Sequence, residues 1–486
     1  MARQAAELRY AVRPHAILKY FGQLCLVLAA LTLMPLAISV IYGETAISLR
    51  YLVVVLGLIL LGAGLARLHA PTDMQANEGM VLVTLIFLFT PLVMSYPMMG
   101  SGLSFIDALF EAISGVTTTG LSTMATVSKV PEALLFSRAW MQWYGGLGIV
   151  VLSLALLIHP GLVAKGLAAT ETEVDDLVGG TKAHARRVLK IYVLLTVIGI
   201  AGAVLAGTGT MNAVLYTMAA VSTGGFAPVD TSLTPLNTAA QWWITLLCLS
   251  GAVPLTLYFR ALRKKRSSVD MLQLFLIIGA AVITSLLLGA SMWLIDDTPW
   301  KSILHHAPLM ALSAQTTAGF SSMPSSQLDA GSKLVLIFSM LIGGGVGSTA
   351  GGFKLFRLLI VIAVFRQIIL RSSLPRHAVM EPSLRGKTLQ ANEIQEAMLL
   401  ILLFAIVVLL SWLPFVVMGY NPLDALFEVV SATGTVGLST GITSASLPVL
   451  LKGVLCADML MGRLEIVAWL VLLYPGTWFG RRMEVA

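Results

Sequence analysis

Four segments of the sequence share a threonine–glycine pattern whose oxygen atoms could bind a cation that has lost its water. Residues 107–121 read DALFEAISGVTTTGL, and residues 424–438 read DALFEVVSATGTVGL. Residues 212–226 (NAVLYTMAAVSTGGF) and 306–320 (HAPLMALSAQTTAGF) align with them at the same spacing. A dehydrated cation needs a ring of oxygens in place of its hydration shell, and backbone carbonyls and threonine hydroxyls can supply one. Glycine allows the positive φ that turns consecutive carbonyls toward one axis.

The candidate ligands lie in the last third of each copy. They are Thr117, Thr118, Gly120, Ser222, Thr223, Gly225, Thr316, Thr317, Gly319, Gly434, Thr435 and Gly437. The copies begin 105, 94 and 118 residues apart, which identifies an internal repeat. Because all four follow a short apolar helix, they are poorly explained as ordinary turns between helices.

The elements around each copy predict a re-entrant loop. The segment before each Thr-x-Gly motif has about 10 apolar residues, whereas a helix needs about 20 to cross a bilayer. Backbone that leaves helical geometry at membrane depth must be buried in protein or line water. We therefore expect each unit to run as a span, a short pore helix, a loop and a second span. The C-terminus of each short helix would direct its partial negative charge toward a cation.

The composition predicts a polytopic membrane protein. Hydrophobic residues make up 57% of the 486 residues and charged residues only 11%, against about 25% in soluble proteins. A soluble enzyme, a disordered protein and a fibrous protein are excluded. Ten apolar runs could contain spans, at 17–42, 51–68, 80–98, 139–163, 188–207, 240–260, 270–295, 333–368, 395–418 and 452–475.

The expected fold is therefore an all-α polytopic membrane protein with about ten transmembrane helices and four re-entrant pore helices around a central pore. Residues 1–79 would form two leading helices. The four span–pore-loop–span repeats would occupy residues 80–165, 186–266, 267–372 and 390–486.

The charges predict an orientation. The chain has 31 Lys and Arg against 24 Asp and Glu, a net charge of +7. The basic residues gather before the first run, after the fourth, sixth and eighth runs, and at the C-terminus, so an even number of spans puts both termini in the cytoplasm. The sequence has no clustered basic domain of the kind that nucleic-acid binding would need. The cysteines, Cys25, Cys248 and Cys456, are far apart and show no metal-site or disulfide spacing.

A run of glycines interrupts the eighth apolar run. Residues 343–352 read GGGVGSTAGG, and each glycine costs about 1 kcal/mol relative to alanine inside a helix. We expect the helix to break here. Close helix packing through small residues is the alternative. A phosphate-binding loop is a poor match, because the pattern GxxxxGK[ST] is absent.

Charged residues also occur inside the expected spans and pore helices. Arg463 lies near the middle of the last run, where an arginine costs roughly 2.5–3.5 kcal/mol on insertion scales. It needs water or an interior partner, either an ion pair or a backbone carbonyl. Asp107 and Glu111, and likewise Asp424 and Glu428, are four residues apart on the short helices. They could concentrate cations at the outer mouth or hold the helices in place.

On these residues the chain resembles the Trk/Ktr/HKT superfamily of potassium transporters, in particular its bacterial TrkH/TrkG branch. The motifs are SGVTTTGLST, QWYGGLGIVVL (142–152), AVSTGGF, SAQTTAGF, GGGVGSTAGGFK (343–354), SATGTVGLST and LMGRLEIVAWLVL (460–472). The resemblance implies K+ uptake across the bacterial inner membrane by a homodimer with one pore per protomer. It also implies a separate cytoplasmic regulatory subunit of the TrkA type, which binds nucleotides. Neither an enzyme activity nor a cofactor other than K+ is expected.

The resemblance also implies roles for particular residues. The glycine-rich run would be an intramembrane gate below the filter, and Arg463 would project into the pore and oppose cations. The gate residues are Gly343, Gly344, Gly345, Gly347, Ser348, Thr349, Gly351, Gly352, Lys354 and Arg463. Glycine at all four filter columns favours K+, because some relatives with serine in the first column pass sodium. The loops lack the Tyr-Gly that completes the potassium-channel motif TVGYG, so selectivity looser than in a channel is expected.

Three alternatives stay open at this point. A sodium-coupled or sodium-permeable relative would have the same architecture. A secondary transporter with broken helices would show inverted repeats, whereas these four units start on the same side. An intramembrane enzyme would need a catalytic constellation at membrane depth, and none recurs in the sequence.

Overall fold

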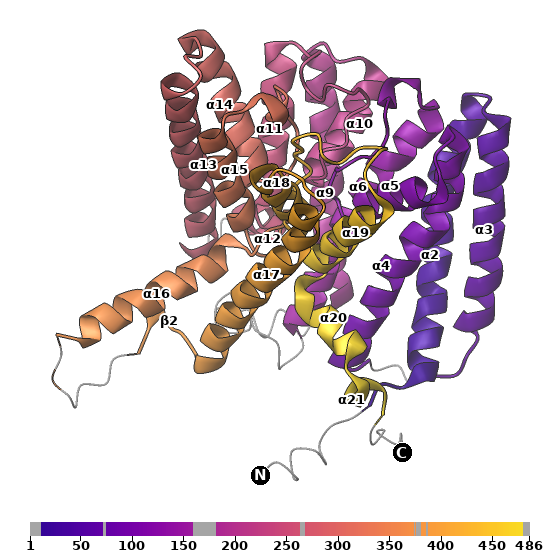
Figure 1. Ribbon diagram of the computed structural model, residues 1–486. Coiled ribbons are helices and arrows are strands. Elements are labelled where there is room, and N and C mark those ends of the chain that lie inside the picture. Colours follow the sequence, from indigo (N-terminus) through magenta and orange to yellow (C-terminus); the bar gives the residue numbers. More distant parts are fainter. Residues whose placement is uncertain are drawn as a thin grey trace. The chain divides into compact units, whose positions relative to one another are not determined.

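The computed structural model is mostly helical, which confirms the expected fold class (Figure 1). It describes residues 11–70, 74–158, 181–262, 268–373, 375, 381–384 and 387–479. Much of the basic charge behind the orientation prediction, at 1–10, 263–267 and 480–486, lies outside these ranges. The chain divides into two compact units, Met1–Ile113 with Lys129–Arg138 and Leu464–Ala486, and Ser114–Ser128 with Ala139–Arg463.

The first unit contains the two leading helices, α2 (Pro14–Ile41) and α3 (Thr45–Ala66), which lie side by side. Their backbones meet at two glycines. A Cβ at Gly22 would lie 2.6 Å from Leu65 Cβ, and one at Gly62 would lie 2.9 Å from the Gly22 carbonyl oxygen. Such small-residue contacts are typical of helix pairs in membranes. The unit also contains α4 (Ala76–Met98), η1 (Met99–Ser101), most of α5 (Phe105–Val116), the start of α6 (Glu132–Ile158), α20 (Glu465–Leu473) and α21 (Pro475–Trp478).

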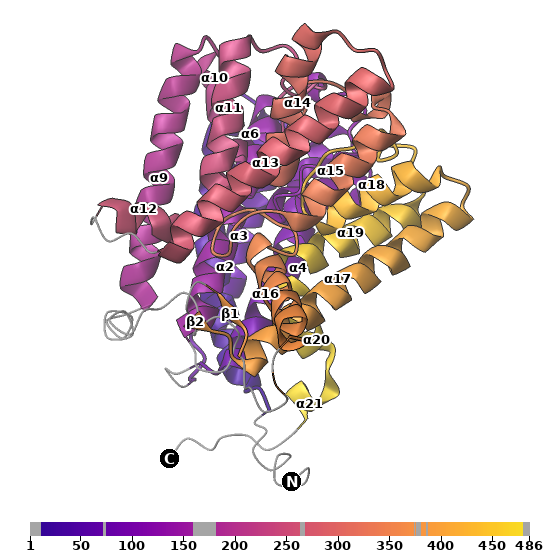
Figure 2. The ribbon, with the colours of Figure 1, turned by 90° about the vertical axis from the view of Figure 1, so that its left-hand side faces the viewer.

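The second unit contains three of the four short helices that precede Thr-x-Gly loops, α10 (Thr210–Val221), α14 (Trp300–Gln315) and α18 (Pro422–Thr433). The fourth is α5, whose last turn and loop also belong to this unit. The other helices are the remainder of α6, α9 (Thr181–Leu205), α11 (Thr238–Ala252), α12 (Leu255–Leu262), α13 (Ser268–Leu294), α15 (Ala330–Ile342), α16 (Leu355–Arg371), α17 (Ala391–Val417) and α19 (Val449–Arg463). Figure 2 shows α13 beside α14 and α15.

Short polar residues fix where several of these helices begin. Asn237 accepts a hydrogen bond from Ala240 N at the start of α11, and Asp329 accepts one from Ser332 N at the start of α15. Side-chain oxygens at this position satisfy backbone donors that the first helical turn leaves free. The remaining elements are small: η2 (Val127–Lys129), η4 (Ser325–Gln327), β1 (Ser383–Leu384) and β2 (Lys387–Thr388), with Ser383 opposite Thr388 in an antiparallel pair.

Six helices in the described part of the chain are long and apolar enough to cross a membrane. They lie within Pro14–Ile41, Thr45–Ala66, Asn77–Ser101, Ala185–Leu205, Met271–Leu294 and Ala391–Val417. The expected run 139–163 corresponds to α6, whose described part ends at Ile158. The other three expected runs, 240–260, 333–368 and 452–475, are each made of two helices.

Two of these three breaks correct the expectation of continuous spans. Between α11 and α12 the chain bends by 89°. The cause is Pro254, which lacks an N–H and forces the preceding Val253 into an extended conformation (φ −83°, ψ 141°). α19 ends at Arg463, directly after Gly462, where a Cβ would lie 1.8 Å from the Thr433 carbonyl oxygen. The close packing of Gly462 holds this end of α19 against the end of α18. The break at 343–354, between α15 and α16, confirms the one that the glycines predicted.

Candidate cation site

The four Thr-x-Gly loops have the same backbone conformation. In each loop a threonine and the glycine two residues later have positive φ. The threonines are Thr118 (54°), Thr223 (52°), Thr317 (54°) and Thr435 (48°). The glycines are Gly120 (95°), Gly225 (79°), Gly319 (75°) and Gly437 (94°). A positive φ is an outlier for a β-branched residue, so its fourfold recurrence shows that the sequence repeat is also a repeat of a strained backbone.

Hydrogen bonds at the end of each pore helix hold these threonines in the left-handed conformation. In the first loop, Thr119 N donates to Ser114 O (2.9 Å) and Thr118 N donates to Gly115 O (3.0 Å). The other three loops have the same two bonds, at 2.7–3.1 Å. This pair is the Schellman motif, in which the left-handed position is usually glycine. Threonine therefore occupies four positions where glycine would be less strained.

The four glycines close a ring. A Cβ built on each of them would lie 2.0–2.3 Å from a backbone carbonyl oxygen of another loop. The pairs are Gly120 with Gly224, Gly225 with Ala318, Gly319 with Val436 and Gly437 with Thr119. The contacts thus run through the loops in chain order and return from the fourth to the first. Neither the space nor the φ at these positions suits a side chain.

Burial distinguishes the glycines from the other candidate ligands. Gly120, Gly225, Gly319 and Gly437 are partly exposed, whereas the threonines and serines of the loops and Gly434 are buried. Several hydroxyls bond within the loops: Thr117 Oγ1 lies 2.8 Å from Thr119 Oγ1, and Thr316 Oγ1 donates to Leu312 O (2.6 Å). Each loop therefore meets accessible space at its glycine. The described residues contain no cluster of His, Cys, Asp or Glu that could hold a metal ion. The oxygens that the four loops carry are backbone carbonyls and hydroxyls, a type that suits a hard cation.

The glycine-rich segment 343–354, which we call the α15–α16 loop, contacts three of the four Thr-x-Gly loops. Gly351 N donates to Thr317 Oγ1 (2.7 Å), and Gly352 N donates to Gly434 O (3.1 Å). Thr349 Oγ1 lies 3.3 Å from Thr223 Oγ1. By contrast, the hydroxyls of Thr118 and Thr435 have no hydrogen-bond partner among the described residues. The loop therefore binds two of the four equivalent threonine hydroxyls.

The α15–α16 loop is compact because its two arms touch. A Cβ at Gly343, which has φ 68°, would lie 2.2 Å from Gly351 O. Ser348 Oγ donates to Gly345 O (2.6 Å), and Lys354 Nζ donates to Ala350 O. Gly344 and Gly345 pack against α11 and Pro254, and Gly347 has no atom within 4 Å of a built Cβ. Among the six glycines of the candidate gate, Gly347 is therefore the one with free space for a Cβ.

Arg463 joins this loop to α6 through backbone oxygens. Its guanidinium donates to Thr349 O (2.7 Å) and Gly145 O (3.4 Å), and the residue is 4% exposed. Arg463 forms no ion pair with a carboxylate among the described side chains. Of the two partners that the sequence left open, the structure shows the carbonyls. A buried positive charge is thus held next to the α15–α16 loop, and no carboxylate of the described residues lies within ion-pair distance of it.

The acidic residues of the pore helices form ion pairs and hydrogen bonds with neighbouring helices and loops. Glu111 pairs with Arg138 (3.1 Å), with side-chain exposures of 0% and 3%. Glu428 is fully buried and accepts hydrogen bonds from Ser439 Oγ (2.5 Å), Thr440 N (2.8 Å) and Thr443 Oγ1 (2.7 Å). Of the two roles considered for these glutamates, burial favours helix and loop positioning over attraction of cations from solution. Asp424 pairs with Lys333 (2.7 Å), and Asp107 accepts a hydrogen bond from Ser104 Oγ (2.7 Å).

Changing Arg138 to methionine should destabilise the protein by about 3–5 kcal/mol, because it removes the arginine that pairs with the buried Glu111 carboxylate. The double change with Glu111→Leu should recover much of that loss. Lys333→Met, which breaks a more exposed pair, should cost about 1 kcal/mol or less. Thermal unfolding of the purified variants in detergent measures all three. A double variant no more stable than Arg138→Met alone would contradict this assignment.

Sequence reasoning missed a set of buried polar residues on the helices behind the loops. Ser114 Oγ and Ser431 Oγ each accept a hydrogen bond, at 3.0 Å, from the ring glycine of their own loop. Gln315 donates to Gly343 O (2.7 Å) and accepts from Ser339 Oγ (3.0 Å). Gln142 contacts the second loop. An amide inside an apolar helix was the available signal, because a buried polar group must find partners.

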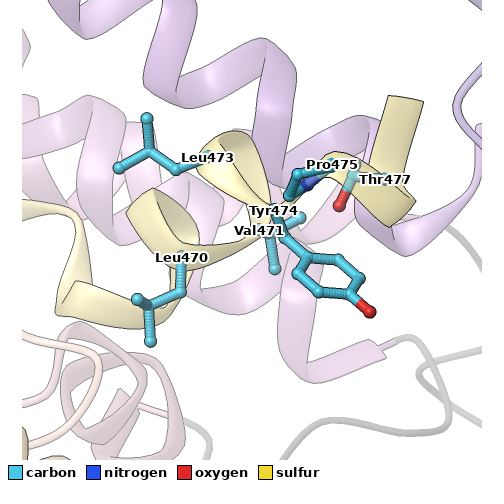
Figure 3. Close-up of a pocket in the computed structure, with 6 residues that line it drawn as sticks. All are labelled: Leu470, Val471, Leu473, Tyr474, Pro475 and Thr477. Carbon is cyan, nitrogen blue, oxygen red and sulfur yellow. The ribbon is translucent and has the colours of Figure 1, made fainter. Parts of the chain in front are cut away.

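A pocket at the end of α20 and α21 contains none of the candidate residues. Figure 3 shows its lining residues, Leu470, Val471, Leu473, Tyr474, Pro475 and Thr477. The lining is mostly apolar and offers few polar groups to a ligand. We therefore place the candidate site at the ring.

A helical chain with several membrane-length helices and four equivalent turns closed into one ring is a multi-pass membrane protein. The chain belongs to the TrkH family of cation transport proteins, whose family model matches residues 54–475. This is a family of cation transporters and not of enzymes.

Named relatives agree with this assignment. The Trk system potassium uptake protein TrkH of Halomonas elongata is 32% identical over 492 residues, covering 95% of this chain and 98% of that protein. An uncharacterized cation transporter of Methanocaldococcus jannaschii is 30% identical over 458 residues and 94% of each chain. The crystal structure of the potassium transporter TrkH from Vibrio parahaemolyticus matches with a TM-score of 0.83 at 25% identity, covering 96% of this chain and all of that one.

Proposed function

We propose that this chain carries K+ into the cell across the bacterial inner membrane, with both termini in the cytoplasm. The observation that carries the proposal is the closed ring of four equivalent turns, each with threonine in a strained left-handed position. Such strain persists where the surrounding structure enforces it, commonly at functional sites. The relatives named above as potassium transporters support K+ as the cargo. The repeats that supply the ring would be 80–165, 186–266, 267–372 and 390–486, after two leading helices in residues 1–79.

The driving force would be the membrane potential. A potential of 100 mV is worth about 2.3 kcal/mol per charge, or roughly 50-fold accumulation of a monovalent cation. The chain itself then needs only to select the ion and to control its passage. Selection belongs to the twelve loop residues proposed as ligands, which combine glycine backbone with threonine and serine oxygens.

Control of passage belongs to the α15–α16 loop and Arg463. The loop binds the Thr223 and Thr317 hydroxyls and the Gly434 carbonyl, so in this arrangement it lies against the filter loops. Arg463 adds a buried positive charge at the same place, which would raise the barrier to a cation. We propose that a cytoplasmic nucleotide-binding subunit of the TrkA type releases this gate, and that the chain acts as a homodimer.

The direct test is Rb+ uptake into proteoliposomes that contain only this chain, with K+ and Na+ as competitors. Competition by K+ at far lower concentrations than Na+ is the expected result. Equal competition would favour the sodium-permeable alternative. No uptake by folded protein, with or without the regulatory subunit, would overturn the pore assignment.

Changing Thr317 to valine should raise uptake without the regulatory subunit by about fivefold, because a lost hydrogen bond of about 1 kcal/mol loosens the α15–α16 loop. Valine keeps the branched shape and removes only the hydroxyl that accepts from Gly351 N. Thr217→Val is the matched control, since that buried hydroxyl on α10 has no partner among the described residues. Equal rates for both variants would count against the proposed gate.

A further inference from the structure

A glutamine outside the four loops holds the second loop from both sides of its ring glycine. Gln142, on α6 in the first repeat, is fully buried. Its Nε2 donates to Gly224 O (2.6 Å), and its Oε1 accepts from Phe226 N (3.1 Å). These bonds flank Gly225 and fix the peptide groups on either side of it. One amide thus satisfies a donor and an acceptor of the ring backbone.

The shape of the second loop fits this contact. A Cβ at Gly224 would lie 2.4 Å from Gln142 Cδ and 2.5 Å from Oε1, so the amide occupies the space that a side chain would need. The carbonyl that Gln142 binds is also the one that abuts Gly120. Gln142 therefore contacts the ring at the junction between its first and second loops.

No other repeat with a comparable packing glycine has a glutamine at this position. Gly145, Gly251 and Gly462 each pack against the carbonyl that ends a pore helix, those of Val116, Val221 and Thr433. The residues three before these glycines are Gln142, Cys248 and Met459. The other two repeats have a weakly polar or apolar residue at this position, so the amide of Gln142 must serve a contact that is specific to the first repeat.

The second loop supplies that reason, because it lacks a bond that the first and fourth loops have. In the first loop the N–H of Gly120 donates to Ser114 Oγ, and in the fourth the N–H of Gly437 donates to Ser431 Oγ. The corresponding residue on α10 is Ala219, which has no hydroxyl. Gln142 thus provides from a neighbouring repeat the polar support that the second loop cannot provide for itself.

We propose that Gln142 is a positioning residue for ion selection: it fixes the second loop so that its oxygens keep the spacing of the ring, without itself touching the ion. The inference rests on the proposed function. If the amide is lost, the peptide groups around Gly225 can rotate, and the ring can contract around a smaller ion. The discrimination between K+ and Na+ should therefore fall, while the maximal rate of uptake changes little.

Two variants test the amide. Gln142→Met keeps the length and removes both bonds, whereas Gln142→Glu keeps the acceptor for Phe226 N and places an acceptor opposite Gly224 O. The control is Gln241→Met, a buried glutamine of α11 that donates to the carbonyls of Leu233 and Leu236, away from the ring. The measurement is Rb+ uptake into proteoliposomes with K+ or Na+ as competitor, reported as the ratio of their inhibition constants together with the maximal rate.

We expect both Gln142 variants to lower the ratio by about tenfold, equivalent to 1.4 kcal/mol, while Gln241→Met keeps it. Adding Ala219→Ser to Gln142→Met should restore part of the ratio, because it recreates the support of the first and fourth loops. A folded Gln142→Met protein with the parent ratio would overturn the inference. If that variant does not fold, the ratio of Gln142→Glu decides in the same way. A parent protein without preference for K+ would instead overturn the proposed function.

Discussion

Replacing Gly120 by serine is expected to lower the preference for K+ over Na+ by tenfold or more. Two features oppose any side chain there: a φ of 95° and a Cβ that would lie 2.3 Å from Gly224 O. A strained backbone position costs about 1–3 kcal/mol, and each 1.4 kcal/mol of differential interaction with two ions is tenfold in relative affinity. The ring must widen or shift to admit the Cβ, and its spacing for one ion size is lost.

The chain offers a close control for this change. Gly441 has a φ of 96°, and a Cβ there would have no atom within 4 Å. Gly441→Ser thus carries the same backbone strain without the clash inside the ring. Competition of K+ and Na+ against Rb+ uptake should change in Gly120→Ser and stay at the parent value in Gly441→Ser. Selectivity that is unchanged in Gly120→Ser, or equally reduced in both, would contradict the assignment of the ring as the filter.

Changing Arg463 to alanine should increase uptake by at least tenfold in proteoliposomes that lack the regulatory subunit. The change removes a buried charge and, with it, the hydrogen bond to Thr349 O that holds the α15–α16 loop. Charge-assisted hydrogen bonds contribute about 1.5–3 kcal/mol, which corresponds to roughly 10- to 150-fold in the population of a released loop. The charge itself would add to the barrier that a cation meets.

Glutamine at the same position separates these two effects. Arg463→Gln removes the charge but keeps an amide that can donate to a carbonyl. Uptake as fast as that of Arg463→Ala would assign the barrier to charge, and uptake near the parent rate would assign it to the bond with the loop. Parent-like uptake in both variants would remove Arg463 from the proposed gate.

The sequence was informative where the signal was repeated or local. Four copies of Thr-x-Gly at equal spacing predicted that distant segments adopt one conformation, and six glycines in ten residues predicted the break after α15. The bend at Pro254 was also a local signal, but the hydropathy of residues 240–260 runs through the proline without a gap. Hydropathy reports which residues tolerate lipid or a protein interior, and it does not report whether the backbone stays helical.

Two features of the site could not be read from the sequence. Propensity places glycine at the left-handed end of a helix, so threonine at Thr118 and its equivalents gave no sign of a positive φ. Gln142 and Gly224 are 82 residues apart and belong to different repeats. Their contact exists only because the ring brings the first and second loops together, and no spacing rule encodes it. The part that these residues play in ion binding is the proposal that the variants above test.

The ring also has a genetic consequence, because one chain encodes all four of its parts. In a pore built from four identical subunits, a single codon change alters every quarter at once. Here a mutation alters one quarter and leaves three intact, so a ring that selects the ion as proposed can be changed one loop at a time. The same property lets an experimenter introduce one, two, three or four substitutions and read selectivity as a graded series.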